Sequence, residues 1–148
     1  MMRSKKDNIA EYILYLWQME DYLRAFPQNA EATPELHELN EMMHREGILE
    51  GGHLALANNA LSELEQLHAQ LLNEDAMYRA ALIRLTPQLN LLKAKTDRPT
   101  MSDIEACLLL LYQIMMLRLQ KKEISAETAA VQKQATEVLR FLSKAYLS

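Results

Sequence analysis

The stretch IEACLLLLYQIMMLRLQKKEIS, residues 104–125, decides the fold. Ser102 and Glu105 match a capping box, in which each side chain bonds to the backbone N–H of the other residue, so we expect a helix to begin after Ser102. The residues that follow are apolar on nearly every side of such a helix, which is typical of a buried helix. Lys121 and Lys122 place positive charge in its last turn, where the helix dipole favours it. The pattern predicts a central helix that other helices surround.

Further helices are expected on both sides of this one. Good helix formers dominate the chain, and only three glycines and four prolines interrupt them. Capping residues such as Thr33 and Ser125, together with glycines and prolines, divide the rest of the chain into helical segments at about 7–26, 33–47, 53–72, 75–95 and 125–147. Short connections make consecutive helices antiparallel. The sequence therefore predicts an all-α fold, an up-and-down bundle of five to six helices with the fifth helix central, in a single domain that covers residues 1–148.

Two helix boundaries depend on particular residues. Ser4 and Asp7 resemble a capping box at the start of the first segment. Thr86 and Pro87 interrupt the fourth segment, because proline has no backbone N–H and its ring clashes with the preceding turn. Either the helix kinks at Pro87, or one helix ends there and another begins with Thr86 as its cap. The sequence leaves both alternatives open.

Charge and hydropathy exclude several classes of function. The 148 residues carry a formal net charge of -4, which argues against nucleic acid as the main partner because phosphate binding needs a cationic surface. The longest uncharged apolar run, residues 106–117, is far shorter than the roughly 20 residues that span a bilayer. The N-terminal residues show no secretory signal. We therefore expect a cytoplasmic protein without membrane contact. Cys107, the single cysteine, is expected to be a small core residue.

Three ionisable residues fall on apolar faces of the expected helices. Glu20 lies on the apolar face of the first segment, His68 on that of the third and Arg118 on that of the fifth. Each lies toward the C-terminal end of its helix, and alternate helices of an up-and-down bundle run in the same direction. We therefore expect the three side chains to face the same core at a similar level. Glu20 would pair with Arg118, with His68 or a tyrosine hydroxyl nearby.

This cluster has two interpretations. It is either a buried polar network that fixes the register of the helices, or the polar floor of a ligand pocket at one end of the bundle. In the second interpretation Glu20, His68 and Arg118 are ligand-binding residues. Arg118 would then hold a carboxylate or phosphate group of a small molecule through its planar guanidinium.

A metal site is the weaker alternative. The pattern Glu-x-x-His occurs at residues 41–44 and 65–68, and with Glu20 and Glu105 it approaches the ligand set of a carboxylate-bridged di-iron centre. In that centre all ligands project inward, whereas the first motif here lies away from the apolar face of its helix. The two motif helices are also consecutive. We therefore predict neither a metal site nor a cofactor.

The residues favour a non-enzymatic protein over an enzyme. The sequence contains no glycine-rich phosphate loop, nucleophile elbow or cysteine-based zinc spacing. The aromatic residues of the first segment spread too far round the helix to be covered by one neighbour. This surplus favours either an unusually enclosed helix or a subunit interface, and we expect a homodimer that acts through protein contacts. The aromatic residues are Tyr12, Tyr15, Trp17, Tyr22 and Phe26.

Four blocks of the chain resemble one family. They are NIAEYILYLWQMEDYLRA (residues 8–25), EMMHREG (41–47), LHAQLL (67–72) and the stretch quoted first. These blocks, in this order, are similar to an uncharacterised bacterial all-helical family, domain of unknown function 4924. The resemblance covers nearly the whole chain and implies a helical fold and a bacterial, cytosolic setting. It implies no chemistry, and it transfers no catalytic role to Glu20 or Arg118, which lie within the matching blocks.

Overall fold

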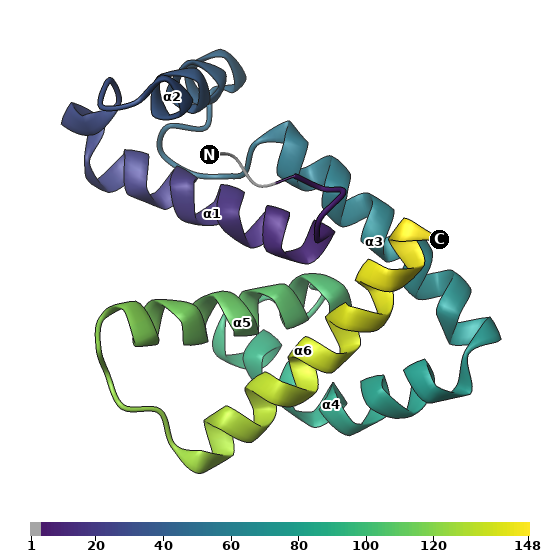
Figure 1. Ribbon diagram of the computed structural model, residues 1–148. Coiled ribbons are helices and arrows are strands. Elements are labelled where there is room, and N and C mark those ends of the chain that lie inside the picture. The colour runs from purple at the N-terminus through teal and green to yellow at the C-terminus, as the bar shows by residue number, and fades with distance from the viewer. Residues whose placement is uncertain (1–3) are drawn as a thin grey trace. The chain divides into compact units, whose positions relative to one another are not determined.

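A computed structural model describes residues 4–148 (Figure 1), and in that part the chain is all-helical. The expected all-α class with five to six helices is confirmed, because the described residues form six α-helices and no strand. One short 3-10 helix, η1, lies between the first two helices. The elements are α1 (Ile9–Ala25), η1 (Pro27–Asn29), α2 (Pro34–Glu46), α3 (Ala55–Glu74), α4 (Ala76–Lys95), α5 (Asp103–Leu119) and α6 (Ala126–Leu147).

Side-chain caps set where most of these helices begin. The oxygens of Thr33, Ser102 and Ser125 each accept the backbone N–H three residues further on, as expected from the sequence. The expected cap at Ser4 is wrong. The Ser4 hydroxyl accepts the backbone N–H of Lys6, and the Asn8 side chain caps α1 instead by accepting the N–H of Glu11 at 3.0 Å.

Pro87 neither ends nor divides α4. The helix continues from Ala76 to Lys95, and the Thr86 hydroxyl donates to the carbonyl of Leu82 at 2.9 Å rather than capping a new helix. Pro87 is exposed, so the carbonyl that loses its N–H partner, that of Ile83, lies on the solvent side. This position lets the helix tolerate an interior proline.

The chain divides into two compact units, Met1–Glu63 and Leu64–Ser148, with the boundary inside α3. A single domain over residues 1–148 therefore stays a prediction. In the first unit α1 packs against η1 and α2. Its core includes Ile13 and Leu16 from α1 and Leu39 and Met43 from α2, all of which are fully buried.

In the second unit α4, α5 and α6 pack against one another (Figure 1). The expected burial of the fifth helix is confirmed, because Gln113 is the only exposed residue of α5 before Arg118. Cys107 is fully buried, and its Sγ lies 3.6 Å from the carbonyl oxygen of Ala135. Burial raises the pKa of this thiol to about 12, which suits the expected core role and not a reactive thiolate.

Within residues 4–148 no helix combines the length and the apolar character that crossing a bilayer requires.

Replacing Pro87 tests the cost of an exposed proline inside α4. Pro87→Ala restores the hydrogen bond to Ile83 and should raise the free energy of unfolding by about 1–3 kcal/mol, measured by urea denaturation at fixed protein concentration. Ala80→Pro, at another exposed position of α4, should lower it by a similar amount. A Pro87→Ala protein less stable than wild type would contradict this account.

Candidate functional site

Glu20 is buried, as its position on the apolar face of α1 predicts. Its two carboxylate oxygens have separate partners. Oε1 lies 2.7 Å from Nδ1 of His53, and Oε2 accepts the backbone N–H of Leu54 at 2.8 Å. The structure thus gives Glu20 partners other than the arginine expected from the sequence. Both oxygens are satisfied, which is what a carboxylate needs in order to be tolerated in a core.

The partners of Glu20 lie at the N-terminal end of α3. Leu54 directly precedes this helix, and its carbonyl accepts the N–H of Asn58 within the first turn. A second carboxylate is bound there too, because Glu46 Oε1 accepts the N–H of Ala55 at 2.7 Å. The first N–H groups of a helix have no partner within the helix, and the dipole favours negative charge beside them. The two glutamates therefore hold the start of α3.

Arg24 lies one turn after Glu20 on α1 and holds the same connection. Its guanidinium donates to the carbonyls of Ile48, at 2.9 Å, and Gly52, and it pairs with Asp21 at 3.3 Å. The connection turns at Gly52, where φ is +89° and a residue with a side chain would be strained. We call Glu20, Arg24 and His53 the loop anchor. They fix residues 47–54 against α1.

His53 is the exposed member of the loop anchor. Its ring stacks on Trp17 with 4.8 Å between centroids, and 39% of its side chain is exposed. A buried carboxylate that orients an imidazole through Nδ1 leaves Nε2 as a base or a metal ligand, and catalytic and metal-binding histidines are held in this way. His53 was not among the residues predicted from the sequence to bind a ligand, and its position indicated only a turn or the start of a helix. The missed signal was that the inward-facing Glu20 requires a donor from a neighbouring loop.

His68 pairs with a tyrosine of the second unit. Its Nδ1 lies 2.7 Å from the hydroxyl of Tyr78, which is fully buried and meets Phe141 edge-on at 5.8 Å. Burial lowers the pKa of the His68 imidazole, although the negative charges of Asp103 and Glu65 act to raise it. Burial also raises the pKa of Tyr78. The neutral imidazole can therefore accept a hydrogen bond from the Tyr78 hydroxyl at Nδ1, in the tautomer that carries its own proton on Nε2.

Arg118 is exposed, so its expected burial in the core is wrong. It lies in the last turn of α5, and its guanidinium donates to Oε1 of Gln132 on α6 at 2.7 Å. A long side chain at the end of a helix can reach solvent from an inward-facing position. The positive charge there also complements the dipole of α5.

The three predicted ligand-binding residues therefore have different surroundings. Glu20 belongs to the first unit and bonds to His53 and Leu54, whereas His68 and Arg118 belong to the second unit and bond to Tyr78 and Gln132. A common ligand site for Glu20, His68 and Arg118 stays a prediction.

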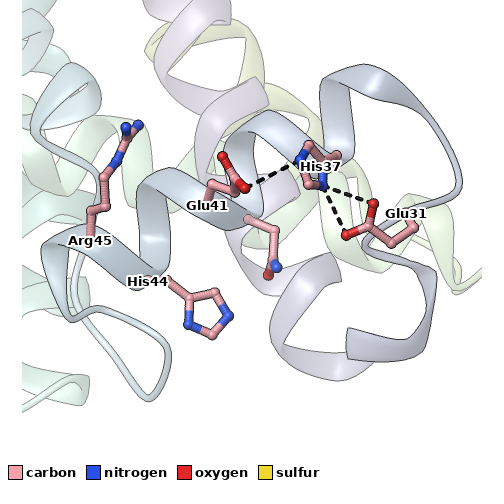
Figure 2. Close-up of a pocket in the computed structure, with 6 residues that line it drawn as sticks. Glu31, His37, Glu41, His44 and Arg45 are labelled. Carbon is pink, nitrogen blue, oxygen red and sulfur yellow. Dashed lines mark hydrogen bonds and ion pairs between the residues drawn. The ribbon is translucent and has the colours of Figure 1, made fainter.

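The surface around α2 carries a further polar cluster (Figure 2). His37 lies between two carboxylates, with Nδ1 2.8 Å from Glu31 and Nε2 3.3 Å from Glu41, and these carboxylates raise its pKa. His44, from the first Glu-x-x-His motif, takes no part in these contacts. An open depression of about 470 Å³ lies here, lined by Glu31, His37, Asn40, Glu41, His44 and Arg45. Across residues 4–148, no three His, Cys, Asp or Glu side chains are grouped so that they could hold a metal ion.

Comparison with known families identifies the chain. It matches the domain of unknown function DUF4924 over residues 2–36 and 28–148. The chain belongs to this family. The resemblance seen in the sequence is confirmed, and the DUF4924 chain is all-helical as that resemblance implies. Comparisons with curated proteins and with solved structures found no match.

Removing the Glu20 carboxylate tests the loop anchor. Glu20→Ala leaves the N–H of Leu54 and the ring of His53 without their buried acceptor and should cost about 3 kcal/mol of stability. Glu20→Gln keeps an acceptor for Leu54 and should cost about 1 kcal/mol. Chemical denaturation measures both. Glu38→Ala removes an exposed carboxylate from α2 and serves as the control. Equal stability of Glu20→Ala and this control would rule out the anchoring role.

The lowered pKa of His68 predicts a pH dependence. The unfolded chain binds a proton near pH 6.5 and the folded chain does so only at lower pH, so stability should fall as the pH drops below about 6.5. His68→Asn keeps an acceptor for Tyr78 without titrating. Wild type should therefore lose more stability than His68→Asn between pH 7 and pH 5, by thermal or urea melts. His37 titrates in both proteins and cancels in the difference. Parallel pH profiles would contradict the assignment.

Proposed function

We propose that the chain is a non-enzymatic bacterial, cytoplasmic protein that acts through protein contacts and has a second copy of itself as partner. The supporting observation is the outer surface of α4. Met77, Ile83 and Leu91 are 71%, 68% and 53% exposed, although all three are large and apolar. Single exposed apolar residues are ordinary, but several on one helix are typical of an interaction surface.

The other side of α4 is already used within the second unit. Tyr78, Leu85 and Leu89 are fully buried there, so α4 carries one apolar face toward its own core and another toward solvent. A helix of this kind is stable when a neighbour covers each apolar face. We propose that the second neighbour comes from another chain.

The polar groups support a contact function better than catalysis. The buried carboxylate of Glu20 and the hydroxyl of Tyr78 are both engaged in hydrogen bonds that position the chain itself. The net charge of -4 supports a partner other than nucleic acid. The proposal requires neither a membrane nor a cofactor.

Binding of a small molecule is the alternative function. Its supporting observation is His53, whose part-exposed ring is oriented by Glu20 and stacked on Trp17. A ligand site that includes Glu20, His68 and Arg118 belongs to this alternative.

Light scattering after gel filtration tests the contact function. We expect twice the mass of one chain at micromolar concentrations, because burial of the exposed apolar side chains of α4 drives association. A molecule that stays monomeric up to high micromolar concentration would exclude the homodimer.

A further inference from the structure

The exposed face of α4 carries a symmetric arrangement of apolar residues. Proceeding outward from Pro87, an apolar residue occurs four and then seven positions away in each direction. At 100° per residue these positions fall within an arc of about 80° on the helix. All five residues are exposed. We call them the α4 stripe: Ala80, Ile83, Pro87, Leu91 and Ala94.

This symmetry suits one type of partner. An interface about a two-fold axis joins the same patch on both chains, so the patch must be complementary to itself. If two α4 helices lie antiparallel with Pro87 at the axis, Ile83 faces Leu91 of the second copy. Ala80 likewise faces Ala94 of the second copy. Large residues then meet near the centre, and small residues at both ends allow the helices to approach closely.

Charge at the two ends of α4 favours the same orientation. Asp75 caps its N-terminal end, and Lys95 stands in its last turn. An antiparallel pair places the acidic end of each helix beside the basic end of the other. A parallel pair would place like charges together, and the helix dipoles would also repel.

We infer that the α4 stripe is a homodimer interface in which two copies of α4 pack antiparallel about a two-fold axis at Pro87. The inference rests on the proposed function, since it names the surface through which the chain meets its second copy.

Engineered cysteines test the orientation. Cys107 is buried and is the only cysteine of the chain, so any disulfide between two chains comes from the added, exposed cysteine. Pro87→Cys should form a disulfide-linked dimer on mild oxidation. Ile83→Cys and Leu91→Cys should each crosslink poorly alone but at least tenfold more when mixed. Equivalent Ile83 positions lie about 12 Å apart along an antiparallel pair, which exceeds the reach of a disulfide.

The mixed sample is combined under reducing conditions and given time to exchange subunits before oxidation. Ala130→Cys, at an exposed position of α6, is the control and should stay monomeric on a non-reducing gel. Crosslinking of Ile83→Cys alone at the level of the mixture would overturn the antiparallel arrangement. Equal crosslinking of Pro87→Cys and Ala130→Cys would overturn the interface.

A charged substitution separates this inference from the proposed function. Ile83→Asp should weaken dimerisation at least tenfold in light scattering while circular dichroism stays unchanged, because Ile83 is exposed in the single chain. Leu147→Asp replaces another exposed leucine, at the end of α6, and should leave the dimer intact. A wild-type monomer would refute the proposed function together with this interface. A dimer that Ile83→Asp leaves unchanged would refute the interface alone.

Discussion

The first unit depends on one buried carboxylate. Glu20 is out of water, and it is tolerated because the N–H of Leu54 and the ring of His53 satisfy its two oxygens. The N-terminal end of α3 gains a negative charge at the place where its dipole favours one. Arg24 holds the carbonyls of the same loop from one turn further along α1. Glu20 thus satisfies hydrogen-bond donors of the connection, and Arg24 satisfies its carbonyl acceptors.

The sequence predicted the helices well because their ends are encoded locally. A cap and the backbone N–H that it accepts are three residues apart, so Thr33, Ser102 and Ser125 could be recognised without any tertiary information. Ser4 was wrongly predicted as the N-cap because Asn8, four residues later, has a side-chain oxygen that caps a helix equally well. Local patterns identify possible caps, and the packing of the helix selects the one that is used.

The polar cluster was predicted only in part, for a different reason. Helical periodicity gives the face on which a side chain lies, and it correctly placed Glu20 inside. Periodicity predicts neither the hydrogen-bond partner of a side chain nor how deeply it is buried, because these depend on loops and on where each helix ends. His53 comes from a loop without periodicity. Arg118 lies on an inward-facing stripe, yet one turn from the end of α5, where its long side chain reaches solvent.

The helix α4 shows how charge can be neutralised before association. It contains four basic residues and no acidic one, which would oppose the pairing of two copies. Three of the four are engaged within their own chain: Arg79 with the carbonyl of Leu72, Arg84 with Glu137, and Lys93 with Asp103. The apolar stripe between them is therefore flanked by compensated charges. An isolated amphipathic helix with a basic face would favour an anionic partner. The α4 stripe, whose flanking charges are compensated, is suited instead to the same apolar stripe of a second copy.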